Sequence, residues 1–434
     1  MSLQDYQRDM EGCSRCSSCK WIPFNQVKSW RYAHNCPSVS RYNFHAYSGS
    51  GKMIMGLSML TGRSELTEEV MNIIFSCQLC GACDTACKVY RDDIDLMEVL
   101  LELRAHCIEE GELLIEHMAV MDALKREGNM LGEEKDKRGS WAEGLDVKDI
   151  NEEPAEVLFH AGCRYSYDPE LRETIRGTVK LLSEAGIDVG IAGATECCCG
   201  GRAYKFGYRG EAENYADDML SRVKSSGAQT LVTPCSDGYS AFIYLYPRLQ
   251  KELPVEVLHL GHYLERLMWE GRIQLKKEIP RRVTYHDPCY LGRMGEPYMG
   301  EWQENKLLRP MSMKRAGRKG NYDMPRRIIN SIPGLELVEM ERIKEYSWCC
   351  GAGGGVLEAD PDFASWTAAE RIEEALSTGA DALVTACPWC LKMFRESIAE
   401  SGAQIDIYDL ADLVLESAGI REPVAPKGVD LNDA

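Results

Sequence analysis

Five cysteines in the C-terminal half of the chain follow the spacing C-x59-CC-x36-C-x2-C. An upstream copy, C-x34-CC-x35-C-x2-G, has a glycine, Gly238, where its fifth cysteine would fall. The two sets are Cys289, Cys349, Cys350, Cys387 and Cys390, and Cys163, Cys198, Cys199 and Cys235. Adjacent cysteines suit an iron–sulfur cluster better than disulfides or a zinc site. The repeated spacing therefore predicts electron chemistry.

The composition fits metal binding in a reducing compartment. The chain has 434 residues, enough for two or three domains, and 19 cysteines. Its first residues show no basic region followed by an apolar stretch, so we expect no signal peptide and a cytoplasmic location, where thiols stay reduced. No apolar run approaches the ~18 residues of a membrane helix. The net charge of −18 disfavours nucleic acid and anionic membranes as partners.

The charge has one local exception. Between Lys306 and Arg327, eight basic residues accompany a single acid, Asp323. Two interpretations carry equal weight: a solvated loop, and a docking surface for an acidic partner or an anionic substrate.

The N-terminal cysteines form two separate C-x2-C-x2-C runs, the second extended by C-x3-C, with Cys36 between them. In two-cluster ferredoxins the last cysteine of each run ligates the other cluster. This logic predicts two [4Fe–4S] cubanes, because zinc sites typically use C-x2-C pairs and two C-x2-C-x2-C triplets fit them poorly. The expected ligand sets are Cys13, Cys16, Cys19 and Cys87 for one cluster, and Cys77, Cys80, Cys83 and Cys36 for the other. Lys88 replaces the proline that usually follows the last cysteine, and the gap before Cys36 is long.

The sequence divides into five segments. Residues 1–106 are expected to form a ferredoxin-like domain of coil and short helices, and residues 107–154 a helical linker. Apolar spacing predicts a helical stretch from about 94 to 125, and residues 129–154 are Gly-rich and charged. Residues 155–275 and 276–421 are expected to form two related α/β units, the first degenerate and the second intact. Residues 422–434 are expected to be a flexible tail.

The two α/β units repeat one plan. GAQTLVTPCSDGYSAF (227–242) aligns without a gap to GADALVTACPWCLKMF (379–394). Short apolar runs alternate with helical segments, which predicts two doubly wound parallel sheets. The expected strands are 156–162, 188–192 and 229–233, then 282–287, 335–340 and 382–385. We expect the cysteines at the carboxyl ends of the strands, where open α/β sheets place their ligands.

Paired cysteines require an irregular loop, because neighbouring side chains in a strand point to opposite faces. CCGAGGG (349–355) supplies such a loop, and CCCGG (197–201) supplies one in the first unit. The alternative for Cys387 and Cys390 is a thioredoxin-like dithiol, but its copy in the first unit would then need a second sulfur at Gly238. Cys107 and Cys197 are left over and are interpreted as buried, weakly polar side chains.

Taken together, these motifs resemble the cysteine-rich "CCG domain" iron–sulfur proteins, which include catalytic subunits of heterodisulfide reductase and the iron–sulfur subunit of glycolate oxidase. The resemblance covers nearly the whole chain and includes YHDPCYLGR (285–293) and VTACPWC (384–390). It implies a noncubane [4Fe–4S] cluster that cleaves disulfides, held by Cys289, Cys349, Cys350, Cys387 and Cys390. The four cysteines of the first unit could hold a cubane, a modified cluster or nothing.

Histidines adjoin both sites. His286 precedes Cys289 and His160 precedes Cys163, where each could supply a proton to a leaving thiolate or simply bond a carbonyl or a sulfide.

The resemblance implies an oxidoreductase: the iron–sulfur subunit of a heterodisulfide-reductase-like complex that passes electrons from the ferredoxin clusters to the C-terminal cluster. The sequence shows no flavin or nicotinamide motif, so a partner, expected to be a flavin-containing subunit, must supply the electrons. The rival interpretation is a pure relay without its own substrate, in a multi-subunit assembly that is electron-bifurcating or built around an aromatic acyl-CoA reductase.

Overall fold

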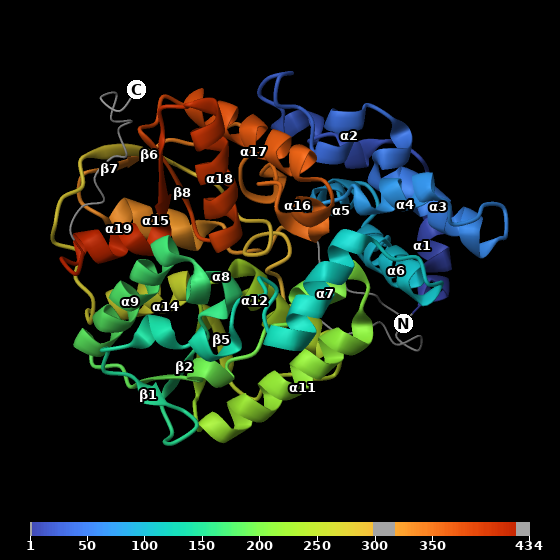
Figure 1. Cartoon of the computed structure of the whole chain (residues 1–434). Helices are drawn as coiled ribbons and strands as arrows, with labels where there is room; N and C mark the ends of the chain where they lie inside the picture. Colours follow the sequence, from blue (N-terminus) through green and yellow to red (C-terminus); the bar gives the residue numbers. More distant parts are fainter. Residues whose placement is uncertain (1, 298–316, 422–434) are drawn as a thin grey trace, which may run out of the picture.

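The computed structural model describes residues 2–297 and 317–421. A helical N-terminal domain, blue to cyan in Figure 1, lies beside two α/β units, green to yellow and orange to red. Its helices are α1 (Gln7–Gly12), α2 (Pro37–Tyr42), α3 (Gly49–Leu60), α4 (Glu68–Phe75), α5 (Ala82–Cys87), α6 (Leu96–Glu109) and α7 (Ile115–Glu127). The helical stretch predicted over 94–125 is thus two helices, separated at Gly111, whose φ is +85°.

The first unit contains a fully parallel five-stranded sheet with the order β1-β3-β2-β4-β5. Its strands are β1 (Lys148–Asp149), β2 (Val157–Phe159), β3 (Val189–Ile191), β4 (Thr230–Thr233) and β5 (Glu256–His259). Its helices are α8 (Gly162–Tyr167), α9 (Pro169–Glu184), α10 (Gly201–Phe206), α11 (Arg209–Ser226), α12 (Ser236–Ser240), α13 (Tyr246–Arg248) and α14 (Leu260–Trp269).

The second unit repeats this topology with four parallel strands in the order β7-β6-β8-β9, which matches β3-β2-β4-β5 strand for strand. Its strands are β6 (Arg281–Tyr285), β7 (Leu335–Leu337), β8 (Ala382–Thr385) and β9 (Asp406–Asp409). Its helices are α15 (Asp323–Ser331), α16 (Val356–Ala359), α17 (Pro361–Leu376), α18 (Pro388–Ser401) and α19 (Leu410–Ser417). The predicted α/β class with parallel sheets is confirmed, and so is the internal repeat.

Apolar side chains cover both faces of each sheet. Phe159 of β2 and Val384 of β8 lie in one shared core with residues of α9, α14, α15 and α19, so the two units are packed against each other. Leu158 faces a core shared with the N-terminal helices, whereas Leu383 faces a core built with α17 and α18. Helices on both faces of a parallel sheet are the doubly wound arrangement.

The segment predicted as a linker is packed onto the first unit. Lys148 and Asp149 form β1, which pairs with β3. Trp141 and Arg138 are buried, and the Arg138 guanidinium donates to Glu196 at 2.8 Å. The sequence indicated a linker here because this segment is charged and glycine-rich. Its packing could not be seen in the local sequence, because the partners of these buried side chains lie far away along the chain.

Part of the basic run between Lys306 and Arg327 lies outside the described residues, which resume at residue 317. Its last two arginines are paired within the fold. Arg326 is buried and donates to Asp287 at 2.6 Å and to Glu339 at 2.6 Å, and Arg327 donates to Glu265 at 2.6 Å. Arg326 therefore stabilises the second unit, whereas Arg327 joins α15 to α14 of the first unit.

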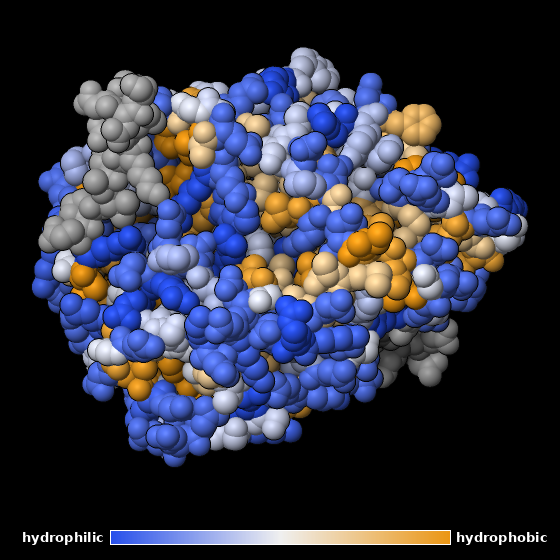
Figure 2. Space-filling model, in the orientation of Figure 1, coloured by the Kyte–Doolittle hydropathy of each residue, from blue (hydrophilic) through white to orange (hydrophobic). Residues whose placement is uncertain are grey.

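The surface is mostly hydrophilic, although Figure 2 shows apolar side chains gathered over α7 and its neighbours, where Leu113, Ile115 and Met118 are exposed. Within the described residues, no helix combines the length and apolar character needed to cross a bilayer.

The interface between the units includes a buried carboxyl group with a perturbed pKa. Tyr165 of the first unit donates a hydrogen bond to Asp409 of the second. Burial, reinforced by neighbouring Asp412, raises the pKa of Asp409 to about 7. An unfolded aspartate titrates near 3.9, so the folded state holds an extra proton between these pH values.

Stability should therefore fall as pH rises from about 4 to about 7, by up to a few kcal/mol, because deprotonation leaves a buried charge. Asp409→Asn, which stays neutral, should lose much of this pH dependence in urea unfolding of the anaerobic protein. The exposed Asp136→Asn is the matched control. Identical pH profiles for wild type and Asp409→Asn would contradict the assignment.

Candidate iron–sulfur sites

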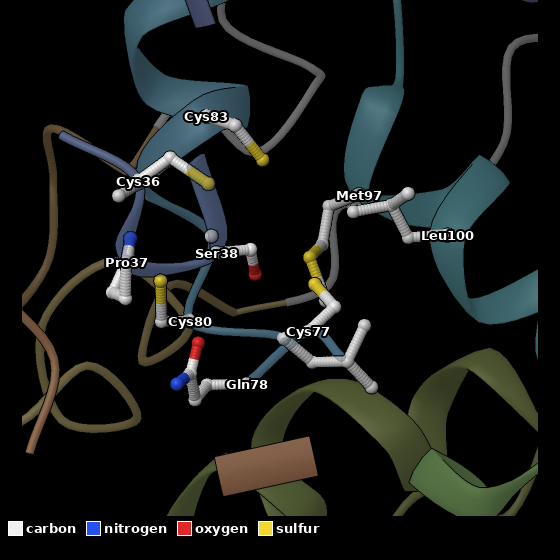
Figure 3. Close-up of a pocket in the computed structure, with 12 residues that line it drawn as sticks. Cys36, Pro37, Ser38, Cys77, Gln78, Cys80, Cys83, Met97 and Leu100 are labelled. Carbon is white, nitrogen blue, oxygen red and sulfur yellow. The ribbon is translucent and has the colours of Figure 1, made fainter. Parts of the chain in front are cut away.

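The second N-terminal cysteine set converges on one pocket. Cys36, Cys77, Cys80 and Cys83 line it together with Met97 and Leu100 (Figure 3). Cys36 caps the start of α2 and Cys83 lies on α5, whereas Cys77 and Cys80 lie on the turn between α4 and α5. Gly81, with φ +77°, lets this turn close around the pocket.

The first N-terminal set assembles one helical turn away on α5. Cys87 ends α5, and the thiols whose charges raise its pKa include Cys19, Cys13 and Cys16. Cys16 is exposed, whereas Cys19 is buried and receives a hydrogen bond from the Ser50 amide at 3.4 Å. The structure thus brings the cysteines of each N-terminal set together, with α5 contributing one cysteine to each, and their assignment as cluster ligands stays a prediction.

The chemistry of these pockets fits iron–sulfur clusters. Burial raises the pKa of Cys36 and of Cys87 to about 12, so convergent thiols would stay protonated without a metal to hold them as thiolates. Backbone amides are directed at the sulfurs: Arg15 donates to Cys13, and Ala82 to Cys80. Amide–sulfur hydrogen bonds of this kind are what tunes the potential of a bound cluster.

The five cysteines of the second unit form a continuous chain of contacting thiols. Cys289 contacts Cys349, which contacts Cys350, and Cys350 contacts Cys390, which contacts Cys387. Cys289 follows β6 and Cys387 follows β8, two adjacent strands, so their carboxyl ends bring the sulfurs together. Gly351, at φ +100°, turns the paired-cysteine loop, and its amide donates to Cys349 Sγ at 3.3 Å.

His286 completes this site. Its ring and the sulfurs of Cys350 and Cys390 have ligand atoms within 4.8 Å of one another. Nδ1 of His286 accepts a hydrogen bond from Nε of Arg371 at 3.1 Å, which leaves the ring proton on Nε2.

Arg371 is itself fixed, since it is fully buried and donates to Glu374 at 2.7 Å and to Ser347 Oγ at 3.1 Å. Arg342 also donates to Glu374, at 2.9 Å. This network orients the imidazole before any ligand binds.

The first unit keeps only part of this arrangement. Cys163, Cys198 and Cys199 contact one another, whereas Cys235 lies between the two units, near Cys387 of the second and Cys199 of the first. A Cβ at Gly238 would lie 3.5 Å from Thr233 Oγ1, so the backbone there has room for a side chain.

The charged neighbour of the histidine in the first unit is opposite in sign to that of His286. His160 Nδ1 lies 3.7 Å from the carboxylate of Glu196, where the second unit offers an arginine. A carboxylate favours a proton on Nδ1, whereas the Arg371 donor excludes one. The Nδ1 atoms of the two histidines therefore face groups of opposite charge, a carboxylate in the first unit and a guanidinium in the second.

The N-terminal domain and the second unit meet at their cysteines. The side chains of Cys80 and Cys349 are in hydrogen-bonding contact. Arg293 Nε donates to the Cys80 carbonyl at 2.9 Å, and the Tyr290 hydroxyl donates to the Leu79 carbonyl at 3.0 Å. The second N-terminal site and the C-terminal site are thus direct neighbours.

The two leftover cysteines, Cys107 and Cys197, are buried as predicted. Sequence reasoning missed the buried arginines around the sites: Arg104, Arg138, Arg202, Arg293 and Arg371. The only available signal was arginine at core-facing positions of otherwise apolar segments, as in LLELRAHC (100–107).

Comparison with known proteins agrees with these domains. Residues 157–242 and 312–395 match the cysteine-rich domain family CCG, and residues 9–90 match the 4Fe-4S dicluster domain family.

One subunit of the dihydromethanophenazine:CoB--CoM heterodisulfide reductase of Methanosarcina acetivorans is 29% identical over 95% of each chain. The protein of the same name from Methanosarcina mazei is 28% identical over 95% of each. The EtfAB:quinone oxidoreductase of Syntrophomonas wolfei is 27% identical over 79% of this chain and 46% of its own length. The chain therefore belongs to the iron–sulfur oxidoreductases that join a 4Fe-4S dicluster domain to two CCG domains, and its role is electron transfer.

Proposed function

We propose that this chain is the disulfide-reducing iron–sulfur subunit of a heterodisulfide-reductase-like complex. Electrons enter at the ferredoxin-like domain and reach the C-terminal cysteine site. The observation that carries this proposal is the contact between Cys80 and Cys349, which joins the last ferredoxin site to the intact CCG site. The similarity to the heterodisulfide reductase subunit of Methanosarcina acetivorans over 95% of the chain supports it.

The expected cofactors are two [4Fe–4S] cubanes in the N-terminal sets and a noncubane [4Fe–4S] cluster on the five C-terminal cysteines. When bound, the noncubane cluster would supply a one-electron centre that can bond a substrate sulfur. Reduction of R–S–S–R′ to RSH and R′SH consumes two electrons, delivered singly, and two protons.

His286 is the residue placed to handle one of these protons. The Arg371 donor keeps its Nδ1 unprotonated, so Nε2–H is the group that can donate to a developing thiolate. In the first unit, the carboxylate beside His160 favours the other tautomer, so we assign no proton donation to it.

The electron source must be another subunit. A flavin-containing heterodisulfide-reductase-like subunit is the partner we propose, because a flavin converts two-electron donors into single electrons. The sequence itself carries no flavin motif.

A second candidate is a relay without its own substrate. It is favoured by the burial of the C-terminal thiols, since Cys289, the most exposed of the five, is only 8% exposed. A relay needs no opening to solvent, whereas a disulfide must reach a sulfur or an iron atom.

The ligand assignment predicts the iron content. Anaerobically purified protein should hold about 12 iron atoms if the first unit is empty and about 16 if it holds a cluster. Cys350→Ser should remove about four of these while the ferredoxin signals survive, because their ligands lie in another domain. Cys197→Ser is the matched control, since Cys197 is equally buried and next to the first unit's cysteine pair. An iron content in Cys350→Ser equal to that of wild type would contradict the ligand assignment.

The proton-donor role predicts a selective kinetic defect. With reduced methyl viologen as donor and oxidised glutathione and coenzyme A disulfide as probes, His286→Leu should slow thiol formation about 100-fold at normal iron content. His160→Leu, the same change in the first unit, should stay within about twofold of wild type.

Equal rates for the two histidine variants would contradict the donor role. Substrate binding has its own readout: oxidised wild type treated with 2-mercaptoethanol should show a paramagnetic signal that Cys350→Ser lacks. If wild type neither reduces a disulfide nor shows this signal, the relay becomes the better description.

A further inference from the structure

A loop of exposed aromatic side chains joins the two N-terminal cysteine sets. Residues 20–35 begin directly after Cys19 and end directly before Cys36. Backbone hydrogen bonds close the loop, from the Ile22 amide to the Ala33 carbonyl and from the Asn35 amide to the Lys20 carbonyl, both at 2.9 Å. It is the dark-blue segment that precedes α2 at the top of Figure 1, and we call it the aromatic loop.

The aromatic loop presents large side chains to solvent. Phe24 is 79% exposed, Trp30 77% and Trp21 38%. Large apolar side chains gathered on one exposed loop are unusual on a monomer and are enriched at the centres of protein interfaces.

The loop is nevertheless held in place. Arg31 donates to Glu370 at 2.8 Å and to Glu373 at 2.6 Å, both on α17, and Asn35 Nδ2 donates to the Ala82 carbonyl at 2.6 Å. A fixed loop loses little conformational freedom when a partner binds.

The stretch of chain that carries the loop is basic, unlike the chain as a whole, although Glu370 and Glu373 of α17 pair with its Arg31. Residues 12–64 contain seven lysines and arginines and no aspartate or glutamate, although the whole chain has 68 acidic and 50 basic residues. Five of the seven are exposed, namely Arg15, Lys28, Arg31, Arg41 and Arg63, and within the described part of the chain only Arg31 of these forms an ion pair. A partner that fits this surface is acidic.

The loop lies beside the site that is nearest to solvent. Cys16, on the same stretch of chain, is exposed, whereas the cysteines of the second unit are all buried. A redox partner seated on the loop would bring its own centre close to the first cysteine set.

We propose that the aromatic loop is the docking surface for a small acidic electron-transfer protein that delivers electrons to the first N-terminal site. The proposal rests on the proposed direction of electron flow and adds a second route by which electrons enter, beside the flavin-containing subunit proposed above. One electron passes at each encounter, and no bond forms or breaks. An anionic membrane matches the charge but cannot supply electrons.

The test uses the iron-loaded full chain and a purified acidic two-cluster ferredoxin as the probe. The loop variant combines Phe24→Ser, Lys28→Glu and Trp30→Ser. The control variant combines Ile115→Ser, Lys180→Glu and Trp269→Ser, which change equally exposed side chains far from the loop in sequence. Stopped-flow absorbance measures reduction by the pre-reduced ferredoxin between about 20 and 500 mM salt.

Wild type and the control variant should be reduced rapidly at low salt and more slowly as salt rises. The loop variant should be about tenfold slower at low salt with a weaker salt dependence. Iron content and reduction by methyl viologen should be equal in all three proteins, which shows that the loop variant is folded and loaded.

Equal ferredoxin rates for the loop and control variants would overturn the proposal, as would a wild type that the ferredoxin does not reduce. Loop-dependent sedimentation with phosphatidylglycerol vesicles, with ferredoxin rates unaffected, would assign the loop to a membrane surface instead. Viologen-driven disulfide reduction does not need the loop, so its failure would refute the proposed function and leave the docking result standing.

Discussion

One buried guanidinium forms hydrogen bonds with all three parts of the chain. Arg104 on α6 is inaccessible to solvent and donates to the carbonyls of Cys77 at 2.6 Å, Lys205 at 3.0 Å and Gly354. These carbonyls belong to the turn of the second ferredoxin site, to α10 of the first unit and to the paired-cysteine loop of the second unit. Irregular cysteine loops leave carbonyls without backbone partners, and Arg104 satisfies one in each part.

This arrangement is costly in isolation, because burial lowers the pKa of Arg104 to about 10 and none of the carboxylates in the described residues forms an ion pair with it. The compensation comes from carbonyl dipoles and from nearby Cys77, which would be anionic with iron bound. Arg293 and Arg202 also donate to backbone carbonyls of the cysteine loops, to those of Cys80 and Ala352 respectively. Buried arginines thus position the cysteine loops as well as complementing their charge.

Much of the fold could be predicted from the sequence, because its signals are local. β8 matches the strand predicted over 382–385, since it is framed by clear turn residues. β5 and β9 were missed because EVLH and DIYD are edge strands, with polar residues and partial burial. The cysteine groupings were accessible from spacing, whereas the contact of Cys80 with Cys349 depends on how domains pack. The Arg371–His286 bond joins residues 85 positions apart, and nothing in the local sequence marks it.

Helix α5 has a consequence for how the protein matures. It contributes Cys83 to one N-terminal set and Cys87 to the other, and the aromatic loop ties Cys19 of the first set to Cys36 of the second. The two pockets therefore share one scaffold, so ordering one pocket also orders part of the other. Biogenesis of the two centres should be a single cooperative event in which iron delivery and folding of the domain finish together.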